Sequence, residues 1–313
     1  VFTSSVKFLI TEKPEGYSAE KVDEIMKPYV EKAEKHNQKA AGKKPNVITI
    51  MNEAFSDLSV LGDIKTNKDF MPFIRGLKEN SVKGTMYMSS YGGQTANSEF
   101  EFLTGSSMAF LPGGSVAYQY QVKDTMGSLA TTMEGQGYQG NMVLHPYLSN
   151  GYNREKVYPL LGFKDYLSIG DFQNPEVCRS FITDQEDFNK ITSEYEKAKQ
   201  KSSAPFFMFN VTIQNHGGYE KDYSNFNQEI KITDTSSNPS ANRYLSLIKK
   251  TDDAFKNLIS YFKKVKEPTV IVMFGDHQPK LPQEFYNKVM DKENGSALEN
   301  EQKKHQVPFI IWA

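Results

Sequence analysis

NVITIMNEAF, residues Asn46–Phe55, is a run of β-branched and apolar residues that closes on an amide, an acid and an aromatic ring. Runs of this kind are typical of strands buried on both faces, which occur mainly in parallel sheets. Glu53 comes at the end of the run. Because ligands bind at the carboxyl ends of the strands in open parallel sheets, this stretch predicts a central strand that brings a carboxylate to a functional edge.

Three further apolar runs end in chemically active side chains. His145 follows NMVL, His216 comes shortly after FFMFNVTI, and Asp276 and His277 follow TVIVMFG. Helical patterns separate these runs, and the chain closes on another apolar run, QVPFIIWA. The alternation predicts an α/β fold with a largely parallel central sheet flanked by helices. Together the runs predict a functional site at one edge of that sheet.

The N-terminal part differs in composition and in its pattern of apolar residues. Ser18–Lys39 is charged, with a weak apolar face that starts at Val22, and predicts one amphipathic helix or two with Pro28 as the bending point. We expect residues 1–44 to form a helical linker or stalk and residues 45–313 to form the catalytic domain. Since the sequence begins and stops abruptly, we also expect both ends to be cut from a longer protein.

Composition excludes some classes of function. The 313 residues include 37 Lys and Arg against 38 Asp and Glu, so no basic excess is available to neutralise the phosphates of a nucleic acid. Cys178 is the single cysteine, which excludes an internal disulfide and a cysteine-based zinc site, and we expect it to be a small buried or half-buried side chain. No run of about 18 apolar residues is present that could cross a membrane.

The strongest local signal for a metal is GDHQP, Gly275–Pro279. Asp276 and His277 stand side by side where a buried strand ends, and a carboxylate with an imidazole can bind a divalent cation. A loop pair that only bonds to the backbone is the alternative. Glu53 is a plausible third ligand, against the alternatives of a helix cap or a solvated acid.

GGQTANSEF, Gly92–Phe100, places Thr95 before a segment that can turn helical. A threonine hydroxyl becomes a nucleophile when a base or metal activates it, and the N-terminus of a helix favours a bound phosphoryl group. Thr95 could equally be a helix cap. The pattern leaves both interpretations open.

The segment HPYLSNGYNR, residues 145–154, supplies a basic group. Arg154 could bind a phosphate bidentately with Asn153 beside it, or it could pair with a surface acid. His216 lies in QNHGGY, where two glycines allow the backbone to approach a ligand.

Taken in order, these motifs resemble the lipoteichoic acid synthase-like phosphoglycerol transferases of the sulfatase and alkaline phosphatase superfamily. The resemblance covers residues 46–313 and is carried by NVITIMNEAF, GGQTANSEF, NREKVYPLLGF, QNHGGY, FGDHQP and VPFIIWA. Tyr152 and Tyr147 depart from lipoteichoic acid synthases, which usually carry tryptophan and a small acidic or amide residue there. HPYLSNGYNR is more similar to the subgroup that adds glycerol phosphate to cell-wall polysaccharide.

The resemblance implies a fold like that of alkaline phosphatase and the sulfatases, and it implies a role for each matching residue. Thr95 would carry the phosphoglycerol group, and His216 would contact the phosphate and exchange protons with the reacting oxygens. One divalent cation, commonly Mn²⁺ with Zn²⁺ or Mg²⁺ as alternatives, would be held by Glu53, Thr95, Asp276 and His277. The substrate would be bound by Arg154, Asn153, Tyr152, His145 and His216.

The resemblance also implies partners and a location. The donor would be the headgroup of phosphatidylglycerol, and the acceptor a glycerolphosphate polymer or a cell-wall polysaccharide. Family members usually have N-terminal membrane helices and an extracellular catalytic domain, so the membrane contact would lie in segments outside this sequence.

Three rival functions remain open. A phosphoethanolamine transferase or a phosphodiesterase of the same superfamily would also use a threonine and a metal, although the single cysteine speaks against the first. The third is a catalytically silent domain that binds glycerolphosphate. The nucleophile motif of the sulfatases is absent around Thr95, so we do not expect sulfate ester hydrolysis.

Overall fold

The computed structural model describes residues 13–39, 42–290 and 295–313. Within them, a seven-stranded sheet has the order β2-β9-β8-β1-β7-β3-β4. Its strands are β1 (Asn46–Asn52), β2 (Ser81–Tyr87), β3 (Gln139–Leu144), β4 (Asp165–Leu167), β7 (Phe206–Val211), β8 (Thr269–Gly275) and β9 (Gln306–Trp312). Strands β8, β1, β7, β3 and β4 run parallel, while β9 is antiparallel to both β8 and β2. The predicted α/β fold with a largely parallel sheet is therefore confirmed.

The central strands are buried on both faces because successive side chains point to opposite sides of a sheet. In β7, Phe206 and Met208 belong to one hydrophobic cluster, whereas Phe207 and Phe209 belong to another. All four side chains are fully buried. The uninterrupted apolar run in the sequence thus reflects two cores, one on each face of the sheet.

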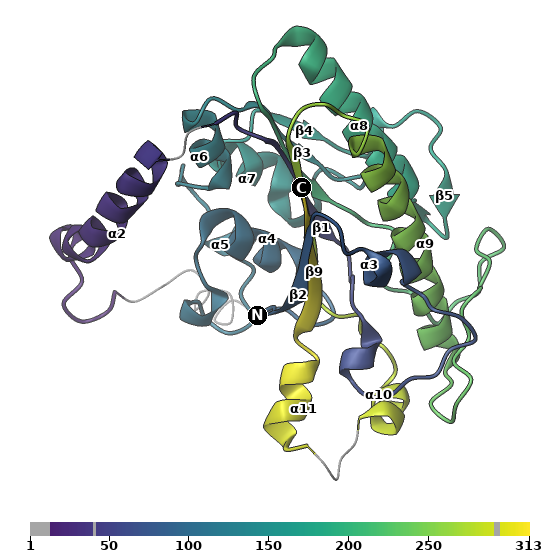
Figure 1. Cartoon of the computed structure of the whole chain (residues 1–313). Helices are drawn as coiled ribbons and strands as arrows, with labels where there is room; N and C mark the ends of the chain where they lie inside the picture. Colours follow the sequence, from purple (N-terminus) through teal and green to yellow (C-terminus); the bar gives the residue numbers. More distant parts are fainter. Residues whose placement is uncertain (1–12, 40–41, 291–294) are drawn as a thin grey trace.

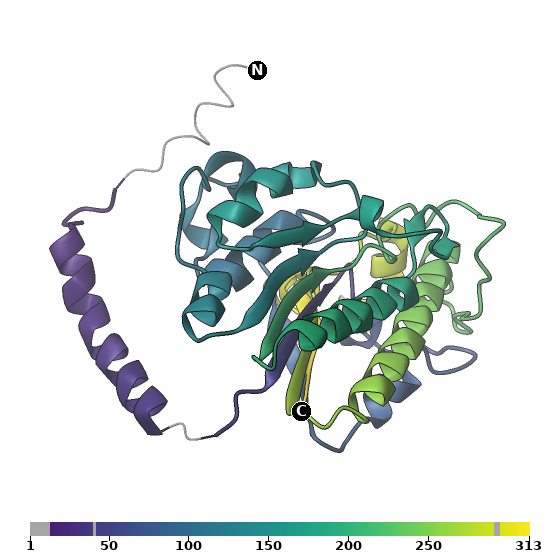
Figure 2. The same cartoon turned by 90° about the horizontal axis from the view of Figure 1, so that it is seen from above.

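Helices cover both faces of the sheet. Helices α8 and α9 pack on one face, and the shorter helices α4 to α7 lie on the other (Figures 1 and 2). The helices are α2 (Ala19–Lys39), α3 (Pro72–Gly76), α4 (Thr95–Thr104), α5 (Ala117–Tyr120), α6 (Leu129–Gly135), α7 (Arg154–Leu160), α8 (Asp184–Lys201), α9 (Pro239–Phe262), α10 (Gln283–Val289) and α11 (Ala297–Lys303). A separate two-stranded hairpin joins β5 (Val177–Cys178) to β6 (Phe181–Ile182), and Cys178 is buried there as expected.

Helix α8 was not predicted from the sequence because charged residues dominate it. The Thr183 side chain caps its N-terminus, and three acidic side chains follow in the first turn, where their negative charge interacts favourably with the helix dipole. Only a narrow stripe that includes Phe188, Ile191 and Tyr195 packs against the core. The spacing of that stripe is helical, but its few apolar residues are outnumbered by charges.

The N-terminal helix α2 continues through Pro28 as one element, and none of its residues is buried. It lies away from the rest of the molecule (Figure 2). Its apolar face, which includes Ile25 and Tyr29, is exposed to solvent. In the described part of the chain, no helix combines the length and the apolar character needed to cross a membrane.

Candidate active site

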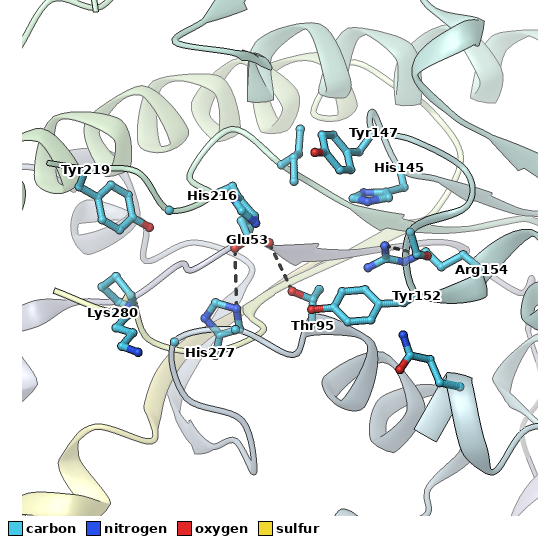
Figure 3. A pocket seen from close by; sticks show the side chains of 17 residues that line it. Glu53, Thr95, His145, Tyr147, Tyr152, Arg154, His216, Tyr219, His277 and Lys280 are labelled. Atoms are coloured by element: carbon cyan, nitrogen blue, oxygen red, sulfur yellow. Dashed lines mark hydrogen bonds and ion pairs between the residues drawn. The ribbon is translucent and has the colours of Figure 1, made fainter. Parts of the chain in front are cut away.

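The carboxyl ends of β1 and β8 meet in the middle of the sheet. The two strands pair with Asn52 opposite Gly275, and Glu53, Asp276 and His277 follow directly. These last three residues, here called the acid cluster, are buried, and one ligand atom from each lies within 4.8 Å of the others. The structure thus brings together the acid and the Asp-His pair that the sequence places at separate strand ends. Figure 3 shows Glu53 and His277 side by side.

The Asp276 carboxylate has one oxygen fixed by the backbone and one left over. Oδ1 accepts hydrogen bonds from the N–H groups of Ala54, at 2.7 Å, and His277, at 2.9 Å. Oδ2 is buried, has no hydrogen-bond partner among the described residues, and lies 3.2 Å from Nε2 of His277. Since buried polar atoms are nearly always paired in folded proteins, Oδ2 is suited to coordinate a cation.

The His277 ring also has one nitrogen bonded to the backbone and one without a hydrogen-bond partner among the described residues. Its Nδ1 lies 2.9 Å from the carbonyl oxygen of Gln278, which can only accept, so Nδ1 carries the hydrogen. Nε2 is buried, lacks a hydrogen-bond partner among the described residues, and lies 3.7 Å from Oε1 of Glu53. Two carboxylates and an imidazole nitrogen are ligands for Mn²⁺, Zn²⁺ and similar ions, so the residues present fit a divalent cation.

The electrostatics of Glu53 favour a nearby positive charge. Burial raises the pKa of Glu53 well above its ordinary value, and the neighbouring Asp276 raises it further. Arg154 and Arg179 act in the opposite direction. Two carboxylates in a buried pocket repel each other, and a bound cation would remove that repulsion.

Thr95 is the first residue of α4, and its hydroxyl is directed to the acid cluster. The N-cap is Gln94, in a left-handed conformation with φ of 66°, so Thr95 does not cap the helix. Its Oγ1 donates to Oε2 of Glu53 over 3.4 Å. Gly92, at φ of 67°, makes the preceding turn, where an added Cβ would lie 2.9 Å from Cβ of Lys280. The close approach of these two segments explains the glycine.

Arg154 is buried and paired with an acid that sequence reasoning missed. Its Nε donates to Oε1 of Glu99 at 3.0 Å and Nη2 to the same oxygen at 2.5 Å. Tyr158 also donates to this carboxylate. Burial acts to lower the pKa of Arg154, but Glu99 outweighs it and raises the pKa. Glu99 lies four residues after Thr95, one turn along α4, and this spacing is the signal that could have found it.

Two of the predicted histidines lie at the same site in different surroundings. His145 is buried, and its Nδ1 donates to the carbonyl of Val211 at 2.8 Å. Burial, and then Arg154, lowers the pKa of His145 well below its ordinary value. His216 is exposed at the cavity mouth, yet nearby protein removes part of its hydration, and this together with Arg179 lowers its pKa as well. Both rings are therefore neutral at pH 7.

A cavity of about 320 Å³ joins these groups. Predicted residues that line it are Glu53, Thr95, His145, Tyr152, Arg154, His216 and His277 (Figure 3). Tyr147 lines it too, whereas Asn153 is not among the lining residues. Asn153 is the N-cap of α7 in a left-handed conformation, so it serves the turn that presents Arg154. Asp276 is fully buried within the acid cluster and is not among the lining residues.

Sequence reasoning did not single out Lys280 and Tyr219, which also line the cavity. Lys280 is exposed and lies three residues after His277, in the same strand-end loop. Among the described residues, it has no ion pair. The strand-end position, which identified His277, is the signal that could have indicated Lys280.

Comparisons with known proteins agree with this architecture. The sequence model of the sulfatase family matches residues 45–313. The solved structure of the Streptococcus pyogenes phosphoglycerol transferase GacH, in complex with sn-glycerol-1-phosphate, is similar with a TM-score of 0.77 and 28% identity over 96% of this chain and 77% of that chain.

Curated relatives extend the comparison. The chain is 33% identical to the "Putative cyclic beta-1,2-glucan modification protein" of Rhizobium meliloti, over 96% of this chain and 46% of the relative. It is 25% identical to the lipoteichoic acid synthase of Staphylococcus saprophyticus, over 82% of this chain and 39% of the relative. The chain therefore spans less than half the length of these two relatives.

The family match covers most of the chain and includes every strand of the central sheet and every residue of the acid cluster. The resemblance to lipoteichoic acid synthase-like proteins that the sequence motifs indicate is confirmed by these relatives. The chain belongs to the sulfatase family and has its mostly parallel α/β fold.

Proposed function

We propose that this domain transfers a phosphoglycerol group from phosphatidylglycerol to an acceptor hydroxyl through Thr95. The observation that carries the proposal is the position of Thr95: it begins α4, and its hydroxyl lies 3.4 Å from the Glu53 carboxylate of the acid cluster. Arg154 lines the same cavity. The similarity to GacH, solved with sn-glycerol-1-phosphate, supports a ligand of this chemistry.

Transfer would take two displacement steps at phosphorus. In the first, Oγ1 of Thr95 bonds to phosphorus while the bond to the diacylglycerol oxygen breaks. In the second, an acceptor hydroxyl bonds to phosphorus and the Thr95 oxygen departs. We assign His216 the proton of the attacking hydroxyl, which it passes to the departing oxygen in each step; its neutral ring is suited to accept that proton.

The surrounding residues would stabilise the transferred group. Arg154 and the N–H groups at the start of α4 would face the phosphoryl oxygens, and Tyr152 and His145 would line the pocket for the glycerol. A divalent cation bound by Glu53, Thr95, Asp276 and His277 would lower the pKa of the threonine hydroxyl and offset charge on those oxygens.

The proposal includes a setting for the reaction. We infer Mn²⁺ as the cation, with Zn²⁺ and Mg²⁺ as the alternatives to test. We infer a glycerolphosphate polymer or a cell-wall polysaccharide as the acceptor, and a catalytic domain, residues 45–313, on the outer face of the cell membrane. Residues 1–44 would link it to membrane segments of a longer protein, as the greater length of the relatives allows.

The test uses Thr95→Ala with Thr104→Ala as a matched control on the same helix, because the Thr104 hydroxyl bonds only to the Phe100 carbonyl of its own helix and to the N–H of Ser106 just beyond it, away from the cavity. Each variant is incubated with phosphatidylglycerol vesicles and Mn²⁺, and released diacylglycerol is measured. We expect Thr95→Ala to lose at least about 10³-fold in turnover and Thr104→Ala to stay within about twofold of the wild type.

Mass spectrometry of the quenched wild-type protein should find phosphoglycerol on the peptide that contains Thr95. In a second arm, the protein is incubated with phosphatidylethanolamine vesicles, which distinguishes phosphoglycerol transfer from the rival phosphoethanolamine transfer. Retention of more than a few per cent of turnover by Thr95→Ala, or labelling from phosphatidylethanolamine alone, would contradict the proposal.

A further inference from the structure

The hairpin β5–β6 has an unusual residue at its turn. Arg179 follows β5 with φ of 59°, a left-handed conformation that residues other than glycine, asparagine and aspartate rarely adopt. Nothing in a two-residue turn requires an arginine. Since strained backbone persists only where other interactions hold it, the contacts of this side chain are the place to look for its role.

The Arg179 guanidinium is buried and bonds to the loop that carries His216. Nη2 donates to the carbonyl oxygens of Gln214, at 2.8 Å, and His216, at 2.6 Å, and Nη1 donates to that of Gly217, at 3.2 Å. The side chain forms no ion pair with an acid in the described part of the chain. Its other neighbours are the aromatic rings of Phe181, Tyr219 and Tyr223. A buried charge without an acidic partner is costly, so holding this loop is its main structural consequence.

The same hairpin also contacts the imidazole ring. Phe181, two residues after Arg179, packs on His216 with ring centroids 5.2 Å apart and on Tyr147 with centroids 6.1 Å apart. The guanidinium of Arg179 lies 5.3 Å from the Phe181 ring. Backbone and side chain of His216 are therefore held by one short element from outside the main sheet.

The hairpin is itself anchored. The Asn225 amide donates to the carbonyls of Val177, at 3.0 Å, and Arg179, at 3.1 Å. The loop that it holds contains two successive glycines after His216 and would have wide backbone freedom without these contacts.

We propose that the β5–β6 hairpin is a clamp that fixes His216 in the cavity, with Arg179 as its positioning residue. The proposal rests on the proposed role of His216 in proton exchange. It assigns no contact between Arg179 and the substrate. Loss of the clamp should therefore slow the chemical steps and leave phosphate binding by Arg154 and cation binding by the acid cluster largely intact.

The closing experiment compares Arg179→Gln, Arg179→Lys and Phe181→Leu with the control Arg243→Gln. Arg243 is also an arginine beside this region, but it bonds to the Tyr219 carbonyl and to Asp222, which lie beyond the residues 214–217 that Arg179 holds. We expect Arg179→Gln to lower kcat at least about tenfold with KM within about twofold, Arg179→Lys to recover part of the loss, and Arg243→Gln to change neither by more than about twofold.

Two readouts distinguish positioning from general structural support. Added guanidinium should restore part of the activity of Arg179→Gln, and the double variant with His216→Gln should be no slower than His216→Gln alone. Equal losses in Arg179→Gln and Arg243→Gln, or additive losses in the double variant, would overturn the clamp.

Hydrogen exchange tests the clamp independently of catalysis. The amides of residues 214–217 should exchange faster in Arg179→Gln and Phe181→Leu than in the wild type, and unchanged exchange there would refute the proposal. If the wild type shows no transfer, or His216→Gln stays active, the proposed function or the role of His216 fails while this exchange result still decides the clamp.

Discussion

At the scale of single residues, Glu99 changes what Arg154 can contribute. The Nε–Nη2 edge of the guanidinium is occupied by Glu99, so only its Nη1–Nη2 end can donate hydrogen bonds to a phosphate. The pair is also neutral as a unit. Positive charge for an anionic substrate must therefore come mainly from the cation that the acid cluster fits and from Lys280 at the cavity wall.

We predict that Glu99→Gln destabilises the protein by about 3 kcal/mol, because it leaves the Arg154 charge buried without a counter-charge. Urea unfolding measures the effect. Glu155→Gln is the control, since Glu155 is exposed next to Arg154 in the sequence and should change stability by less than about 0.5 kcal/mol. If the two variants had the same free energy of unfolding, the buried Glu99–Arg154 pair would not contribute to stability as predicted.

At the scale of elements, the ends of strands were predicted better than the helices. The apolar runs identified β1, β3, β7, β8 and β9 because burial on both faces leaves an uninterrupted signal. The alternating residues EFEF after Ser98 could be strand or helix by pattern, and they are helical in α4. Because most residues of this short helix are buried, its apolar residues do not follow the helical repeat, and the pattern was therefore ambiguous.

The end of β8 gives a prediction at this scale. A Cβ added at Gly275 would lie 2.0 Å from the carbonyl oxygen of Phe55, which is backbone and cannot move aside cheaply. Gly275→Ala should push β8 from β1, displace Asp276 and lower the free energy of unfolding by at least about 2 kcal/mol. Gly113→Ala, where a Cβ meets nothing within 4 Å, is the control.

Urea unfolding and Mn²⁺ titration of both variants check this prediction. Gly275→Ala should also bind the ion more weakly, because the displaced strand end carries a ligand. A Gly275→Ala protein with the stability and metal affinity of the Gly113→Ala protein would show that the strand ends tolerate separation.

At the scale of the whole molecule, the acid cluster joins segments that lie far apart in the chain. Glu53 and Asp276 are more than 200 residues apart, as are the bonded pair Ala54 and Asp276, which the structure records at a separation of 222. A cation bound there cross-links β1 to β8 and can bind only the folded state. Metal binding should therefore add to global stability.

We predict that EDTA lowers the Tm and that Mn²⁺ at about 100 times its Kd raises the free energy of unfolding by about 2.7 kcal/mol over the EDTA-treated protein. Calorimetry with and without the ion measures this. Asp276→Asn should lose most of the shift. Asp252→Asn should keep it, because Asp252 is a buried acid that accepts from the N–H groups of Phe73 and Ile74, away from the cluster. A shift that is the same in both variants would place the ion elsewhere.

The sequence by itself determined the largely parallel sheet and the placement of Glu53, His145, His216 and Asp276 at or just after the ends of its strands. It could do so because a strand buried on both faces is an uninterrupted apolar run, and the polar residues that follow the run mark its carboxyl end. It did not determine which charged side chains meet. Glu99 and Arg154 are 55 residues apart, and Arg179 is 37 residues from the His216 carbonyl that it binds. Such pairings depend on how separate loops cross above the sheet, so only the tertiary structure decided them.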